Sequence, residues 1–329
     1  MSDIVDEFIK LNIDEIKDFK FPLDELFGLE ISHEGVKYNF MINFKSTSSK
    51  LICAGSGAHT GRAKGDLITP LFFSRWSWHK YFDQSFIVYT DPIFYLNDDV
   101  RIGWYIGDED HWYLKTISDI ILKLMENQDI KNEDVLFYGS SGGGFASLGL
   151  GTLIRESGVI VNNAQFFVLN YHQEHVDMAM NTLFEGRDIQ EVYDKFPYRL
   201  DIVELFKKEN YMPQIDYYVN ADSNADLNNH AVPFINKASQ LDCFNENLNI
   251  HFYHSNSGHD PLGNKETISI IKSYFINESP DGIKESEEKL KKENKKLKAK
   301  NKKLEKEIEH FKSTKAYKTW QKYATLRKK

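Results

Sequence analysis

Short apolar runs alternate with stretches of helical periodicity along most of the chain. The apolar runs lie at 51–54, 86–90, 135–139, 165–169, 215–219 and 249–254. They do not alternate with polar residues, which is typical of strands covered on both faces. Helical spacing of apolar residues occurs between several of them, at 112–127, 144–156, 228–241 and 264–276. Strands that alternate with helices predict an α/β fold with a mainly parallel sheet and helices on both faces.

Other segments define the limits of this predicted domain. Residues 1–34 are expected to be an N-terminal helical segment, and 35–44 alternates like an antiparallel strand. Residues 171–212 form a long charged stretch between two expected strands, where a helical cap over a pocket would be inserted. The α/β domain is therefore predicted to span 35–276, with 171–212 as its cap and 277–283 as a linker.

A heptad repeat follows the linker. Apolar side chains recur every seven residues in 284–311, at Leu290, Leu297, Leu304 and Phe311. Asn294 and Asn301 fall at the a positions, and buried asparagines there favour a parallel, in-register dimer. The repeat predicts a coiled-coil helix over 284–311 that forms a homodimer. A trimer and a single solvated helix are the alternatives.

Charge is divided unevenly along the chain. Residues 284–329 contain 18 basic and 7 acidic residues, whereas 1–283 contain 23 basic and 42 acidic residues. An acidic body lacks the basic face that phosphate contacts need, so nucleic acid is not an expected partner. The last segment, 312–329, has seven basic residues, no acidic residue and an aromatic helical face. Such a helix either lies on an anionic membrane or docks on a protein.

Composition indicates a folded protein in a reducing compartment. Of the 329 residues, 41% are hydrophobic, which is enough for a substantial core. No stretch approaches the roughly 18 apolar residues of a membrane span, and the acidic N-terminus does not resemble a secretory signal. Cys53 and Cys243 form neither a disulfide framework nor a zinc motif. We expect a cytoplasmic protein without metal or cofactor. If 312–329 binds lipid rather than a protein, its contact is peripheral and at the inner face of the membrane.

The segment 135–151 carries the strongest chemical signal. An apolar strand leads into GSSGGG and then into a helix of small residues, and the match to GxSxG places Ser141 at the centre. A serine at a sharp strand-to-helix turn needs neighbours without side chains, and the helix N-terminus directs N–H groups at developing negative charge. The alternative is a tight glycine turn without chemistry.

A nucleophilic serine needs a histidine base and a carboxylate that orients it. His259 follows the last expected strand in the loop SNSGHDP and is the candidate base. The acid is expected after the preceding strand, where Asp222 is preferred and Asp226 is the alternative. Ordinary turn chemistry also explains aspartates at such positions.

Two backbone donors would complete an oxyanion hole. One is the N–H of Gly142, directly after the serine, and the other is expected from the loop that contains Gly57 and Ala58. Thr60 replaces the third glycine of GxGxxG in this loop, which disfavours a dinucleotide site. Weaker candidates for substrate contact, with core packing or a structural role as the alternative, are His59, Arg75 and Trp76.

These motifs resemble those of the α/β-hydrolase superfamily over 35–276. The segments LICAGSGAH, PLFFSRWSW, RIGWYIG and FYGSSGGGFAS are similar to a bacterial branch associated with surface-polysaccharide and glycoprotein biosynthesis, near the accessory Sec glycan O-acetyltransferases. The resemblance implies an acyl-transferring or ester-cleaving Ser141, with His259 as base and Asp222 as acid. The expected function is serine-dependent acyl transfer, as an esterase or O-acetyltransferase acting on a glycan or related ester. The superfamily also contains inactive members, so a silent scaffold that partners a glycosyltransferase is the alternative.

Overall fold

The computed structural model describes residues 7–59, 71–244 and 248–277, together with Lys295, Lys296, Lys298 and Lys302. The chain divides into two compact units, Met1–Gly263 and Asn264–Lys329. The first unit contains the whole sheet and every candidate catalytic residue.

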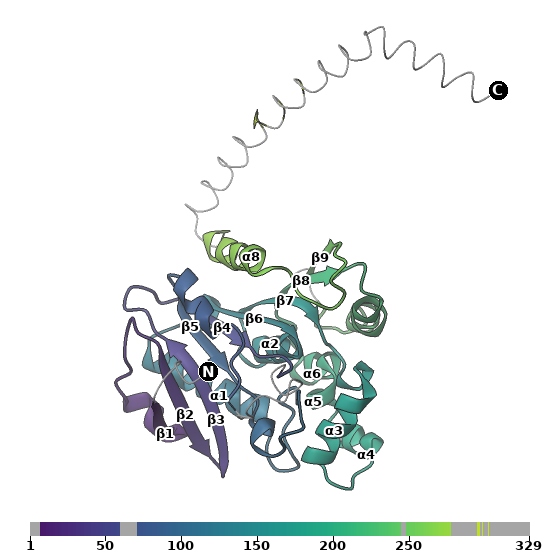
Figure 1. The fold of residues 1–329 in the computed structure, drawn as a ribbon, viewed down its shortest axis with the longest axis horizontal. Coiled ribbons are helices and arrows are strands. Elements are labelled where there is room, and N and C mark those ends of the chain that lie inside the picture. Colours follow the sequence, from purple (N-terminus) through teal and green to yellow (C-terminus); the bar gives the residue numbers. More distant parts are fainter. Residues whose placement is uncertain are drawn as a thin grey trace, which may run out of the picture. The chain divides into compact units, whose positions relative to one another are not determined.

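Nine strands form one sheet in the described part of the first unit (Figure 1). They are β1 (Phe8–Asn12), β2 (Phe27–His33), β3 (Val36–Asn43), β4 (Leu51–Gly55), β5 (Ser85–Tyr89), β6 (Val135–Ser141), β7 (Gly158–Ala164), β8 (Gln214–Asn220) and β9 (Leu248–Tyr253). Their order is β1-β2-β3-β5-β4-β6-β7-β8-β9. Only β3 pairs antiparallel, with β2 and with β5, and every other pair is parallel. The predicted mainly parallel sheet is confirmed.

Helices connect the strands of this sheet. The α-helices are α1 (Tyr113–Asn127), α2 (Gly142–Leu153), α3 (Gln173–Leu183), α4 (Ile189–Lys195), α5 (Pro197–Leu200), α6 (Ile202–Glu209), α7 (Val232–Ala238) and, in the second unit, α8 (Asn264–Asn277). The 3₁₀-helices are η1 (Ile13–Asp18), η3 (Trp76–Tyr81), η4 (Pro92–Tyr95), η5 (Asn132–Asp134) and η6 (Val168–Asn170), and η7 (Asp226–Ala231) is a π-helix.

The central strands are covered on both faces, which explains their unbroken apolar runs. Helix α2 packs on β4, β6 and β7, with α1 and α6 beside it. Phe137 of β6 belongs to the core cluster on that side. Tyr138 follows it and points to the opposite face, because successive side chains of a strand alternate. There Trp78 of η3 stacks on Tyr138, with ring centroids 5.8 Å apart.

The expectation for residues 1–34 differs from the structure. Instead of a helical segment, this region contains β1, the short 3₁₀-helix η1 and β2. In β2, Leu29 and Ile31 are fully buried, whereas Ser32 is exposed, so the second half of this strand has the alternation of a strand. Because β2 is the single partner of β1 in the described sheet, the extended conformation of β1 depends on tertiary pairing rather than on local propensity.

A second difference concerns the strand expected at 165–169. The strand is β7, at Gly158–Ala164, and the apolar residues after it form a turn and η6. Both segments are apolar, and Phe166 and Val168 are completely buried. Hydrophobicity alone therefore could not separate the strand from the buried turn that follows it.

Helices α3 to α6 occupy the long segment between β7 and β8, where the cap over 171–212 was expected. Arg199 of α5 is buried, and its guanidinium lies 4.1 Å from the centre of the Phe196 ring. The predictions for 284–311 and 312–329 lie outside the described residues except for the four lysines named above, each of which is helical. No described helix is long and apolar enough to cross a membrane.

Candidate active site

Ser141 lies at a sharp turn between β6 and α2. Its backbone has φ 55° and ψ −128°, a conformation that costs energy for a residue with a side chain and persists only where its surroundings enforce it. Glycines make the turn sterically feasible. A Cβ on Gly139 would lie 2.0 Å from the carbonyl oxygen of Gly143, and one on Gly143 would lie 2.4 Å from that of Gly55. The predicted strand–serine–helix turn is therefore present.

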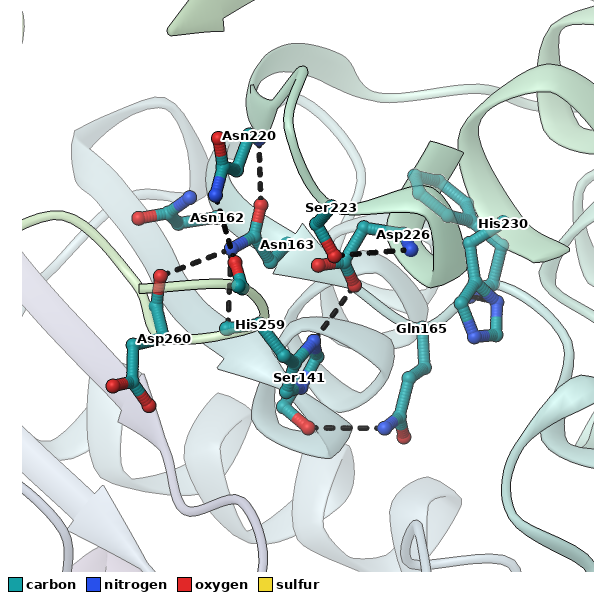
Figure 2. A network of polar contacts seen from close by, with 12 residues as sticks. Ser141, Asn162, Asn163, Gln165, Asn220, Ser223, Asp226, His230, His259 and Asp260 are labelled. Atoms are coloured by element: carbon teal, nitrogen blue, oxygen red, sulfur yellow. Dashed lines mark hydrogen bonds and ion pairs between the residues drawn. The ribbon is translucent and has the colours of Figure 1, made fainter. Parts of the chain in front are cut away.

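His259 and Asp226 form a direct pair (Figure 2). Nδ1 of His259 lies 2.7 Å from Oδ1 of Asp226, whose side chain is only 2% exposed. A carboxylate can only accept hydrogen bonds, so Nδ1 of His259 carries the proton and donates it. In the neutral ring Nε2 then keeps its lone pair and is available as a base. Nε2 is buried and has no hydrogen-bond partner among the described residues.

The structure does not bring Asp222, the preferred acid, to His259. Its Oδ1 accepts a hydrogen bond from Nδ1 of His254 at 3.0 Å, in a pair whose side chains are 45% and 76% exposed. Asp226 is carried by the π-helical turn η7, which turns its carboxylate inward. The alternative acid, not the preferred one, therefore contacts the histidine.

Asparagines at the ends of β7 and β8 hold the histidine loop in place. Nδ2 of Asn163 donates to the carbonyl oxygens of His259 and Asp260, both at 3.1 Å. Nδ2 of Asn220 donates to those of Ser255 and Gly258, both at 2.8 Å. Neither asparagine could be identified from the sequence, because amides at strand ends are common and their partners lie about 35 and 97 residues away.

The same anchoring brings His259 toward Ser141. β7 is the direct neighbour of β6 in the sheet, and Ser141 pairs with Ala164, one residue after Asn163. In Figure 2 the His259 ring lies between the Asp226 carboxylate and the Ser141 side chain. Among the described residues no hydrogen bond joins Ser141 to His259. Instead Oγ of Ser141 accepts a hydrogen bond from Nε2 of Gln165 at 3.0 Å.

Gln165 is a site residue that sequence analysis did not identify. It directly follows β7, is completely buried, and its Oε1 accepts a hydrogen bond from Nε1 of Trp104. Trp104 thereby fixes the amide orientation so that the NH₂ group faces Ser141. The sequence pattern predicted a strand at 165–169, which includes Gln165, whereas β7 ends at Ala164. A glutamine inside a predicted strand gives no indication of a chemical role.

Of the two loop residues predicted for an oxyanion hole, Gly57 lies close to the serine. A Cβ on Gly57 would lie 3.8 Å from both the Ser141 Cβ and the Gly143 nitrogen. The N–H of Ser56 is already donated to the hydroxyl of Tyr105 at 3.2 Å. The N–H of Gly142 belongs to the first turn of α2 and therefore has no acceptor within the helix.

The three weaker candidates have structural partners. Arg75 donates from Nη2 to the Oγ of Ser140 at 2.6 Å and stacks over Trp78 and Tyr138. His59 is buried, and its ring stacks on Phe72 with centroids 4.3 Å apart. The Trp76 ring lies under the ammonium of Lys80, 5.8 Å from its centroid.

A second histidine lies near the His259–Asp226 pair. His230 is 3% exposed, and its Nδ1 accepts a hydrogen bond from the backbone N–H of Phe166 at 3.3 Å. Burial lowers its pKa from the ordinary 6.5 to about 4; nearby Asp226 opposes this shift and His259 adds to it. His230 is therefore neutral at physiological pH.

This lowered pKa makes stability depend on pH. Between pH 6.5 and pH 4 the unfolded chain binds a proton that folded His230 excludes, so stability is lost as the pH falls. We expect His230 to account for about 2 kcal/mol of lost stability between pH 7 and pH 5. Urea unfolding of the native protein and His230→Asn at both pH values checks this: the native protein should lose more stability than the variant. Equal losses would contradict it.

No described group of three or more histidine, cysteine, aspartate or glutamate side chains could hold a metal ion.

Solved structures of other proteins share this fold. The capsule O-acetyltransferase of Neisseria meningitidis serogroup A is 21% identical, with a TM-score of 0.54 over 74% of this chain and 94% of that chain. A mutant of that enzyme has been solved in complex with CoA. The Gap123 glycosylation-associated complex from Streptococcus agalactiae is 14% identical, with a TM-score of 0.52 over 77% of this chain and 47% of that chain.

A peptidase has the same architecture. Prolyl oligopeptidase B from Galerina marginata is 16% identical, with a TM-score of 0.50 over 74% of this chain and 35% of that chain. No family model matches the sequence, and no curated protein matches it. The predicted resemblance is confirmed at the level of the fold: this chain has the α/β-hydrolase fold, which it shares with a capsule O-acetyltransferase, a glycosylation-associated protein and a prolyl oligopeptidase.

Proposed function

We propose that the protein is a serine-dependent acyltransferase or esterase that acts on a glycan or a related ester. The observation that carries this proposal is the contact of buried Asp226 with His259, at 2.7 Å, beside a serine in a strained strand-to-helix turn. The O-acetyltransferase among the structural neighbours supports acyl transfer on a surface polysaccharide as the reaction class.

The proposed reaction has two steps. In the first, His259 Nε2 takes the proton of Ser141 while Oγ attacks the ester carbonyl carbon. The oxyanion that forms would be held by the N–H of Gly142 and by that of Gly57 or Ala58. The carbon–oxygen bond to the leaving group then breaks, and His259 gives its proton to the departing oxygen. An acyl group remains on Ser141.

In the second step water or an alcohol attacks the acyl-enzyme. Its proton passes to His259, the bond between the acyl carbon and Oγ breaks, and Ser141 recovers the proton. Asp226 keeps the proton on Nδ1 and stabilises the imidazolium that forms in each step. Gln165 donates to Oγ, so the hydroxyl keeps its own hydrogen and can give it to Nε2 of His259 when the two side chains approach.

A fluorophosphonate probe tests this proposal. An activated serine attacks such a reagent, whereas a serine in an inert turn does not. We expect labelling of the native protein at Ser141, its loss in Ser141→Ala and strong slowing in His259→Ala. Folded protein that stays unlabelled would contradict the proposal.

A silent scaffold that partners a glycosyltransferase is the second candidate. It is favoured by one contact: Oγ of Ser141 is bound to Gln165 and not to His259. The neighbour from a glycosylation-associated complex supports a role in an assembly. Absence of probe labelling, together with co-purification of a glycosyltransferase, would favour this candidate.

We also propose that residues 284–311 pair two chains of a cytoplasmic protein. A leucine seam buries apolar surface only in an oligomer. The double variant Leu297→Asp/Leu304→Asp should therefore separate the chains. Light scattering should give a dimer for the native chain and a monomer for the double variant, with equal probe labelling of both. A monomeric native protein would contradict the proposal that 284–311 pairs two chains.

The basic segment 312–329 is proposed to attach this dimer to anionic lipid at the inner face of the membrane. Its seven positive charges should make binding to phosphatidylserine vesicles weaken as salt increases.

A further inference from the structure

A small cavity of about 130 Å³ opens beside the proposed catalytic pair. Both Asp226 and His259 line it, so whatever occupies it lies next to the base. The other lining residues are Asn170, Tyr171, His172, Ala225, Asn229 and His230. The cavity lies wholly within the first unit, and all of its lining comes from described residues.

The lining favours a hydroxylated guest over a hydrocarbon. Five of the eight lining residues carry an amide or imidazole group. Burying such groups against methylene groups without hydrogen bonds would cost roughly 1–3 kcal/mol each. The volume is also too small for a long acyl chain. A ring that carries hydroxyl groups satisfies such side chains and can pack against the face of Tyr171.

His230 is held rigidly in this lining. It belongs to the π-helical turn η7, the same turn that carries Asp226. π-Helical turns are rare and frequently occur at functional sites. The His230 ring is nearly parallel to that of Phe167, with an interplanar angle of 6°. Nδ2 of Asn170 donates to the carbonyl oxygen of Asn229 at 2.8 Å and fixes the turn.

The hydrogen bond from Phe166 determines which nitrogen of His230 carries hydrogen. Because Nδ1 accepts the backbone N–H, it holds no hydrogen, and in the neutral ring the hydrogen is on Nε2. A proton on Nδ1 would point at the N–H of Phe166, so that two donors would face each other without an acceptor. Burial also keeps the ring neutral. No described residue accepts a hydrogen bond from Nε2–H. His230 is only 3% exposed and lines the cavity, so this donor, held in a fixed orientation, is left for a ligand.

We propose that this cavity binds the alcohol acceptor of acyl transfer, a sugar-like polyol, and that Nε2–H of His230 donates a hydrogen bond to one of its oxygens. The inference rests on the proposed function, because it requires an acyl group on Ser141. The hydrogen bond goes to an oxygen next to the attacking hydroxyl, since a donor on the attacking oxygen itself would reduce its nucleophilicity.

For the transfer step the acceptor hydroxyl must reach Nε2 of His259, which is buried in the free protein. Its oxygen bonds to the acyl carbon while its proton moves to Nε2 of His259. The bond from that carbon to Oγ breaks, and Oγ takes the proton from His259. The products are the acylated sugar and free serine. His230 keeps its proton throughout and determines which alcohol competes successfully with water.

The test is how the acetyl-enzyme partitions between water and a sugar. The full-length protein is given p-nitrophenyl acetate with methyl α-D-glucopyranoside, and sugar ester and acetate are quantified by NMR. In His230→Asn, the side-chain oxygen can still accept from the Phe166 N–H, but no donor reaches the position of Nε2. We expect the ratio of transfer to hydrolysis to fall about 10- to 100-fold.

Two further variants sharpen this comparison. His230→Gln places an amide N–H near the position of Nε2 and should recover part of the ratio. His254→Asn makes the same change at an exposed histidine paired with Asp222, and it should leave the ratio unchanged.

The outcomes separate the two proposals. Ester hydrolysis that persists in Ser141→Ala would overturn both. Hydrolysis that depends on Ser141, but gives no sugar ester in the native protein, would overturn the acceptor site alone. So would a ratio in His230→Asn equal to the native ratio.

Discussion

Replacement of Ser141 by alanine should lower the kcat for hydrolysis of a short p-nitrophenyl ester by on the order of 10⁶-fold. The remaining rate enhancement would come from substrate binding and the oxyanion hole alone. The reason is that Oγ forms the covalent bond, and no other described hydroxyl occupies the turn facing His259. The measurement is steady-state release of p-nitrophenol, with circular dichroism to show that the variant is folded.

Ser140→Ala is the matched control for this prediction. Ser140 precedes the nucleophile, but its Oγ accepts a hydrogen bond from Arg75 and belongs to the support of the turn. We expect the control to lose far less activity than Ser141→Ala. If Ser141→Ala kept more than a few per cent of the native rate, another nucleophile would have to be sought.

Asp226→Asn should lower kcat by on the order of 10²- to 10⁴-fold with the fold intact. An amide can donate to Nδ1 of His259, which favours the tautomer with hydrogen on Nε2 and removes the base. The variant also lacks the negative charge that stabilises the imidazolium. Measured kcat values for Asp226→Asn and for the native protein decide the size of the effect.

Asp222→Asn is the control. Asp222, like Asp226, follows an alanine in the segment after β8, but it pairs with exposed His254. Its cost should be small, since an exposed pair of this kind contributes little and does not touch His259. A larger loss in Asp222→Asn than in Asp226→Asn would return the acid role to Asp222.

The pattern of apolar runs was sufficient to predict the central sheet. β4, β5, β6, β8 and β9 begin and end within one or two residues of the predicted runs, because strands buried on both faces are continuous in hydrophobicity. The prediction failed where pairing partners decide the structure. β1 is extended because β2 is beside it, and the run at 165–169 is buried without being a strand.

The nucleophile and the base of the candidate site could be predicted from the sequence, because each lies in a recognisable motif. Ser141 and His259 lie in short motifs with glycines, and their chain order limits the alternatives. The acid was not determined in this way, because Asp222 and Asp226 both follow β8. Only the π-helical turn distinguishes them, by burying one carboxylate. A hydrogen bond from the Phe166 N–H to His230 holds this turn, and no local pattern encodes that contact.

Gln165 and His230 show a further limit of sequence reasoning. Each is recognisable only from its partners: a tryptophan 61 residues away orients the amide, and a backbone N–H 64 residues away sets the tautomer. Their chemistry depends on burial and on one hydrogen bond each. Neither property has a signature in an isolated sequence.

The most direct test of the central claim is to locate the acyl group during turnover. The protein is mixed with p-nitrophenyl acetate, quenched in acid within the first turnover, and digested with trypsin, which releases the peptide 132–155. Fragmentation by mass spectrometry should place one acetyl group on Ser141, and a chase without ester should remove it. Turnover with no acetyl group on this peptide, or with a stable acetyl group on another residue, would contradict the mechanism.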